Sequence, residues 1–274
     1  MVLDQARGEP GSSEVQWKDD DVDQCSEELC KALEAAAAAL GPLGDIPNLL
    51  PTFMTMQAHL LLVFVRCLSI RATSSSLQRP PLWAVCAKIV RTTVGCLKLQ
   101  LDSHVASRQQ GEELTKGLLG AFLIALEIMY SQNGEMAANV GQRNQGLGQE
   151  TGDAFADVTL MGLSFLPLLC SAVENPPYTN LALAAINVLI KGFVAPTTWL
   201  SILQNHFPAR CLLGRIHADL GTESPKVSLN ITLSLARMRV GAEMLQNAGV
   251  FSHLLILSKQ LQVSWTKTLK KRMY

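Results

Sequence analysis

The chain has 274 residues and a formal net charge of zero, so it lacks the global positive field that nucleic-acid-binding proteins use. Hydrophobic residues make up 48% and charged residues only 17%, which leaves excess apolar surface for a core, a membrane or another protein to cover. Aromatic residues are scarce at 5%, and the abundance of Leu and Ala favours helices packed on helices over a β-sandwich.

The first part of the chain predicts a polar lead-in followed by apolar helices. Residues 1–24 are polar and rich in aspartate, and we expect them to be disordered. Ser26 is a suitable N-cap for an Ala-rich helix. Helices are predicted over residues 27–40, 52–73 and 81–105, and from residue 112 onward. Core residues are expected at helical spacing, namely Trp83, Val85, Ile89, Val90, Val94 and Leu97, and then Leu118, Leu119, Phe122, Leu123, Leu126 and Met129.

Residues 131–152 differ in composition from the helices on both sides. Five glycines lie among Asn and Gln residues, which predicts a flexible loop of about twenty residues, longer than most ordered connections. In a stack of helical repeats, such an insertion lies on one face and leaves the stack intact. The Gly146-x-Gly148 pair does not indicate a phosphate-binding loop, because no Gly-Lys-Ser/Thr follows it.

Four further helices are predicted in the second half of the chain. Their ranges are residues 153–173, 180–194, 199–205 and 208–220. Pro and Gly residues separate these segments, as expected for helix ends. Thr197 or Thr198 is the expected N-cap of the third of them.

The stretch from Ser224 to Leu257 predicts three helices in succession. Ser224 and Pro225 are a suitable N-cap and first helical residue, and Gly249 can take the left-handed conformation that ends the short middle helix over residues 242–247. The apolar residues expected to face a core are Val227, Ile231, Leu233, Leu235 and Met238 in the first helix and Phe251, Leu254, Leu255 and Leu257 in the third.

This rhythm is typical of one armadillo- or HEAT-type unit, which must stack on neighbouring units to bury its apolar faces. We therefore predict an all-α protein in which residues 25–261 form an irregular α-solenoid of stacked antiparallel helices. Residues 262–274 form a basic tail with Lys267, Lys270, Lys271 and Arg272. We expect a solvated end there, and the alternative is a nuclear-localisation or partner-binding patch.

The string LSLARMRVGAEMLQNAGVFSHL, residues 233–254, resembles the C-terminal part of the large inner-ring scaffold nucleoporins of the nucleoporin 188 type, most closely the plant members. A weaker likeness reaches back to about Leu50. The resemblance implies an armadillo/HEAT-like fold, a structural role in the nuclear pore complex at the nuclear envelope, and other inner-ring nucleoporins as partners. The chain contains no Phe-Gly dipeptide, which fits a scaffold component better than a component of the transport barrier.

Catalytic and metal-binding patterns are not found in the sequence. No Gly-x-Ser-x-Gly motif occurs, and the five histidines lie far apart without zinc-ligand spacing. Glu127 could act as a general base, although a carboxylate on a helix more often faces solvent. The seven cysteines include no Cys-x-x-Cys pair and are expected to be reduced and buried. We therefore expect no enzyme, no cofactor and no metal.

A membrane protein is a further class to weigh, because a spanning helix needs about 20 predominantly apolar residues. The apolar run Val158–Val173 is shorter than this and contains Pro167. Arg66 and Glu127 interrupt two other apolar runs. Because charged residues are costly at the centre of a bilayer, we expect no membrane insertion.

The sequence thus predicts a non-enzymatic scaffold of the nuclear pore inner ring that supports nucleocytoplasmic transport by binding other nucleoporins. The alternative is a generic armadillo-like adaptor outside the pore. Candidate protein-binding residues are Met244, Phe251 and Leu255, although helical spacing also favours burial of each in the core. Direct nucleic-acid binding and a small-molecule substrate are not expected.

Overall fold

The computed structural model describes residues 24–25, 27–29, 31–32, 49–74, 79–102, 108–139, 149–218 and 224–272. In these ranges the chain forms helices joined by short turns, with no strand, which confirms the predicted all-α class. From position 49 onward the helices are α2 (Leu49–Ser74), α3 (Arg79–Asp102), α4 (Arg108–Asn139), α5 (Gln149–Val173), α6 (Thr179–Gly192), α7 (Pro196–His206), α8 (Ala209–Ala218), α9 (Ser224–Ala236), α10 (Arg239–Asn247) and α11 (Val250–Arg272).

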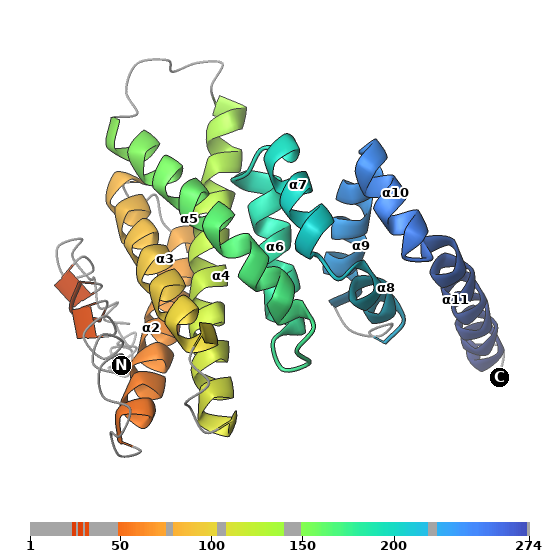
Figure 1. Cartoon of the computed structure of the whole chain (residues 1–274), viewed down its shortest axis with the longest axis horizontal. Coiled ribbons are helices and arrows are strands. Elements are labelled where there is room, and N and C mark those ends of the chain that lie inside the picture. Colours follow the sequence, from red (N-terminus) through yellow and green to blue (C-terminus); the bar gives the residue numbers. More distant parts are fainter. Residues whose placement is uncertain are drawn as a thin grey trace, which may run out of the picture.

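The helices pack in an order that follows the chain (Figure 1). α4 packs on α2, α3 and α6, and α5 packs on α3, α6 and α7. α9 then packs on α6, α8 and α10, while α10 also contacts α7 and α11. Figure 1 shows the result as an elongated molecule with α2 and α3 toward one end and α11 at the other. Each helix therefore contacts near neighbours along the chain, and α2 and α11 lie far from each other.

The predicted cores of α3 and α4 are confirmed, because all twelve of their predicted core residues are buried. Phe122 of α4 meets Phe165 of α5 edge to face, with ring centroids 5.4 Å apart. A second aromatic group joins Trp83 of α3, Phe155 of α5 and Phe193 at the end of α6, with centroid distances of 6.1 and 5.3 Å. These contacts fix α5 against helices on both sides of it in the chain.

Two predictions about helix ends have different outcomes. Gly249 has a φ of 89° and ends α10, as predicted, because glycine adopts the left-handed conformation without a Cβ clash. The predicted caps of α7 at Thr197 or Thr198 are wrong. Ala195 is the extended N-cap residue, and Pro196 occupies the first turn, where its missing N–H costs nothing.

The predicted loop over residues 131–152 is wrong at both ends. α4 continues to Asn139 and α5 begins at Gln149, while residues 140–148 lie outside the described ranges. Good helix formers, Glu135, Met136 and two alanines, follow Gly134 and compensate for its unfavourable propensity. The boundary predicted between the solenoid and the basic tail at residue 262 does not coincide with the end of a helix, because α11 continues to Arg272. Residues 1–23 of the predicted polar lead-in lie outside the described residues.

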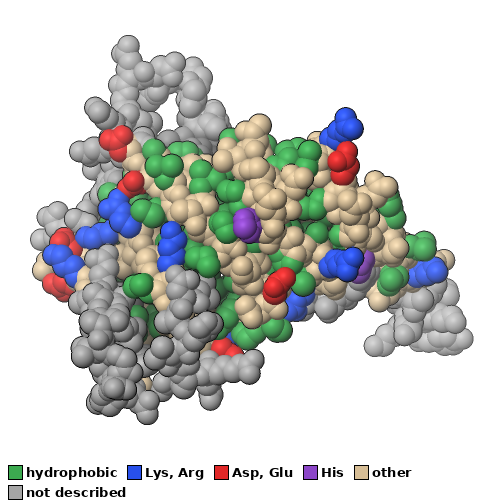
Figure 2. Space-filling model, viewed as in Figure 1, with side chains coloured by type: hydrophobic (Ala, Val, Ile, Leu, Met, Phe, Trp, Pro, Cys, Tyr) green, Lys and Arg blue, Asp and Glu red, His purple; other side chains and the backbone are tan. Residues whose placement is uncertain are grey.

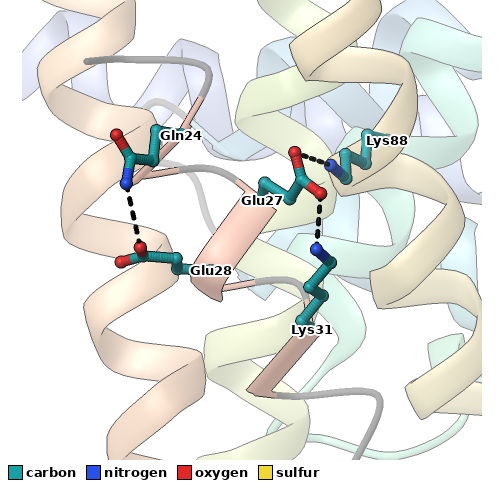
Figure 3. A network of polar contacts seen from close by, with 5 residues as sticks. All are labelled: Gln24, Glu27, Glu28, Lys31 and Lys88. Carbon is teal, nitrogen blue, oxygen red and sulfur yellow. Dashed lines mark hydrogen bonds and ion pairs between the residues drawn. The ribbon is translucent and has the colours of Figure 1, made fainter. Parts of the chain in front are cut away.

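A short helical segment before α2 is tied to α3 by charged side chains (Figure 3). The carboxylate of Glu27 pairs with Lys31 at 2.6 Å, one turn further along, and with Lys88 of α3 at 3.7 Å. Beside it, Gln24 Nε2 donates a hydrogen bond to Glu28 Oε1 at 3.3 Å. Cys25 and Leu29 of the same segment are partly buried and pack against the hydrophobic core.

Candidate protein-binding surfaces

Phe251 and Leu255 lie on the exposed side of α11. They are 70% and 58% exposed, and Leu254 and Ile256 beside them are 42% and 47% exposed. We call these four residues the α11 patch. The prediction that Phe251, Leu254 and Leu255 face a core is therefore wrong. The physical reason is the position of α11 at the end of the row, where it packs mainly on α8 and α10.

The third candidate residue, Met244, lies on α10 and has a different environment. Its side chain is half-buried and packs against the hydrophobic core, next to Leu245, which is buried. The structure thus places Met244 on the core side of α10. Of the three candidates, Phe251 and Leu255 provide the apolar area that solvent reaches.

The charge of α11 is of one sign. Residues 250–272 contain no Asp or Glu, and Lys259 is exposed on the same helix as the α11 patch. Further along the helix the sequence carries Lys267, Lys270, Lys271 and Arg272. Figure 2 shows hydrophobic and basic side chains together at this end of the molecule. A partner for this surface would be apolar, with acidic groups at its edge.

A second exposed apolar surface lies on α2, and it is not among the surfaces predicted from the sequence. Its members lie three and four residues apart and share one side of the helix; they are Phe53, Met56, Leu60, Val63, Cys67 and Ile70. We call this set the α2 seam. The other side of α2, with Met54, Ala58, Leu61, Val65 and Leu68, is buried in the core. The signal was present in the sequence, because a helix that is apolar on two opposite sides needs cover on both.

Glu127, the histidines and the cysteines are the side chains that the sequence analysis weighed for catalysis or metal binding. Glu127 is exposed on α4, and no group of three or more His, Cys, Asp or Glu residues in the described ranges is placed to hold a metal ion. Cys86, Cys96 and Cys170 are buried, as predicted, whereas Cys67 and Cys211 are exposed. The prediction of buried cysteines is therefore wrong for these two, because each lies on an outward side of its helix.

Three of the described helices are long and apolar enough to cross a membrane, judged by length and composition. The segments are Thr52–Ile70, Gly111–Ser131 and Asp153–Val173. The third segment corrects the prediction that the apolar run ending at Val173 is too short to span a bilayer. α5 is helical on both sides of Pro167, and the long apolar segment begins at Asp153. In the folded chain, 72% of the apolar window in Gly111–Ser131 is buried, so other helices of the protein cover much of this segment.

Comparisons of the chain with protein-family models, with curated proteins and with solved structures find no match.

Proposed function

We propose that the chain is a non-catalytic scaffold protein, built as an irregular α-solenoid of stacked antiparallel helices. The contacts support this architecture, because they run in two rows, one through α2, α4, α6 and α9 and the other through α3, α5, α7 and α10. In a solenoid each unit contacts only its neighbours, and the extended surface that results is suited to binding other proteins.

The binding surface in this proposal is the α11 patch. The observation that carries the proposal is the exposure of Phe251 and Leu255 on a helix that has no acidic residue. Contiguous exposed apolar residues with a polar rim are typical of protein-binding sites, and a large aromatic side chain is a common anchor in them. The partner would bury Phe251 and place acidic side chains near Lys259.

The specific form of the proposal is a structural component of the nuclear pore inner ring. It rests on the resemblance of residues 233–254 to the nucleoporin 188 type of scaffold. The resembling segment ends within α11 and includes Phe251 and Leu254, so it overlaps the first half of the α11 patch. The protein would then bind other inner-ring nucleoporins and support nucleocytoplasmic transport from the nuclear envelope.

A fluorescent fusion and an affinity purification test this function together. We expect a signal at the nuclear rim and recovery of inner-ring nucleoporins with the parent chain. The double substitution Phe251→Glu and Leu255→Glu should abolish both results, because two carboxylates would replace the apolar anchors. Leu160→Glu is the matched control, since Leu160 is 64% exposed on α5 and belongs to neither surface. Its variant should behave as the parent does.

The alternative within the same class is an armadillo-like adaptor outside the pore. It predicts no signal at the nuclear rim and recovery of other proteins in place of nucleoporins, with the same loss when Phe251 and Leu255 are substituted. The identity of the recovered partners therefore separates the two forms, while loss of binding in the variant is common to both.

An integral membrane protein is the second candidate function, and the three long apolar helices are the observation that favours it. It predicts that the chain stays in the membrane pellet after carbonate washing. The scaffold proposal predicts release into the supernatant. The scaffold proposal would be overturned if the chain stayed in the membrane pellet after carbonate washing and the purified chain needed detergent to remain in solution.

A further inference from the structure

The α2 seam has the geometry that one helix needs to pair with another. Its residues alternate in steps of three and four, which keeps them on one stripe along about 26 Å of helix. The exposed fractions are 45% for Phe53, 61% for Met56, 52% for Leu60, 56% for Val63 and 68% for Ile70. α2 packs mainly on α4, which covers its opposite side. The seam therefore faces away from the rest of the described chain.

We propose that the α2 seam binds the α2 seam of a second copy of this chain in antiparallel orientation. In that arrangement Phe53 meets Ile70 of the second copy, Met56 meets Cys67, and Leu60 meets Val63. Every member of the seam finds an apolar neighbour, because the seam is symmetric about the point midway between Leu60 and Val63. A surface that complements itself in this way produces a closed two-fold dimer.

The flanking residues favour the antiparallel orientation. Thr52, His59 and Arg66 recur every seven residues along one edge of the seam, and all three are exposed. In an antiparallel pair, the edge position of Arg66 faces that of His59 in the second copy. In a parallel pair it faces the helix position of Arg71, so two arginines would repel each other across the interface.

The same residues argue against the other occupants of this face. α2 contains no Asp or Glu. Glu113 of α4, which lies close enough to His59 for their charges to interact, is already paired with Lys116, so a strongly basic partner gains little there. A bilayer would surround the middle of the helix, where Arg66 belongs to the exposed side. At the edge of a helix pair, the guanidinium group of Arg66 stays in water while the seam beside it is covered.

Sedimentation of the full chain over a range of micromolar concentrations tests the dimer. We expect the mass to rise from 29.7 kDa toward twice that value and no further. The double substitution Leu60→Glu and Val63→Glu should raise the dissociation constant at least about tenfold, because four carboxylates would meet at the centre of the interface. Circular dichroism must show unchanged helix content, which we expect because both positions are exposed.

Two control variants make the result specific. Leu160→Glu and the pair Phe251→Glu with Leu255→Glu should leave the dissociation constant of the dimer unchanged. The second control also separates this inference from the function proposed for the α11 patch. A chain that stays monomeric throughout overturns the inference, as do an unchanged Leu60/Val63 variant, growth beyond a dimer, or partition of the parent chain into lipid vesicles.

Cysteine crosslinking tests the register. In a Cys211→Ser background, Met56→Cys places a thiol opposite Cys67 of the second copy, and copper–phenanthroline with oxygen should then produce a covalent dimer. The same background with Met56 retained should link far less, because Cys67 then faces Met56. Equally strong linking through Cys67 alone would indicate a parallel pair and overturn the antiparallel register.

Discussion

Gly241 of α10 lies directly against the main-chain carbonyl group of Leu235 in α9. A Cβ atom at position 241 would overlap the carbonyl oxygen of Leu235, and main-chain atoms cannot move aside as a flexible side chain can. The close approach arises where the chain reverses between α9 and α10, with the Met238 N–H donating to the same carbonyl at 3.0 Å. Position 241 therefore requires glycine because of packing.

Gly241→Ala should destabilise the protein by about 1–3 kcal/mol, the usual cost of inserting a methyl group into a filled space. Urea denaturation of the purified chain measures the change. Gly214→Ala in α8 is the control, because nothing lies within 4 Å of a Cβ atom there. Alanine has the higher helix propensity, so that variant should be stabilised by up to about 1 kcal/mol. Equal effects at both positions would contradict the packing argument.

Gly249→Ala tests backbone strain without crowding. A Cβ atom at position 249 would meet nothing within 4 Å, yet the φ of 89° is unfavourable for an L-residue. We expect a loss of about 1–2 kcal/mol in the free energy of unfolding. Gly249→Asn should cost less, since asparagine tolerates the left-handed conformation better than alanine does. A larger loss with asparagine than with alanine would contradict this explanation.

The edge-to-face pair of Phe122 and Phe165 should couple α4 to α5. Both side chains are fully buried, so Phe122→Ala and Phe165→Ala should each cost about 3–5 kcal/mol. Because the rings touch, the double variant should lose less than the sum, by about 0.5–1.5 kcal/mol. A double-mutant cycle in urea measures this difference. Strictly additive losses would show that the two rings contribute independently.

The sequence predicts local features of this fold well. Helices begin and end near Pro and Gly residues because those residues restrict or relax the backbone itself, as at Pro196 and Gly249. The cores of α3 and α4 follow from apolar periodicity, because these helices have neighbours of the same chain on several sides. The loop predicted around Gly134 shows the limit, since the residues after a single glycine decide whether the helix continues.

Exposure of the candidate surfaces could not be predicted in the same way. Periodicity shows that Leu60 and Phe251 lie on apolar stripes, but whether the chain itself covers a stripe depends on which helices pack there. α4 covers one side of α2, while the side with Leu60 stays open. Leu123 has an equally apolar context and is buried, because α4 lies between other helices. Position in the stack makes the difference.

The carboxyl group of Glu27 should titrate below its ordinary range. A hydrogen bond from Lys31 lowers its pKa most, and the positive charges of Lys31 and Lys88 add to the effect. The ion pairs are thus complete above a pH of about 4.5 and are lost as the pH falls through the lowered pKa. Carbon-13 NMR of the carboxyl group measures the midpoint. Lys31→Gln should raise it more than Lys88→Gln, and the reverse order would contradict the assignment.

The buried thiol of Cys86 should make stability fall at alkaline pH. Desolvation raises the pKa of this thiol from 9.0 to about 12, because a thiolate is disfavoured in the core. The contribution of this thiol to the free energy of unfolding is complete below pH 9. It is lost as the pH rises from 9 toward the folded-state pKa, because in that range the thiol ionises only in the unfolded chain. The slope is about −1.4 kcal/mol per pH unit.

Urea denaturation of the parent and of Cys86→Ala at several pH values above 9 isolates this contribution. The variant starts less stable because a cavity replaces the thiol, but its stability should fall less steeply with pH. Val90→Ala is the matched control, since Val90 is as fully buried on α3 as Cys86 but does not ionise, so its truncation should leave the slope as in the parent. Parallel curves for the parent and Cys86→Ala would mean that the thiol ionises in the folded chain as readily as in water. The packing of α3 against α4 and α5 would then be looser than the complete burial of Cys86 indicates.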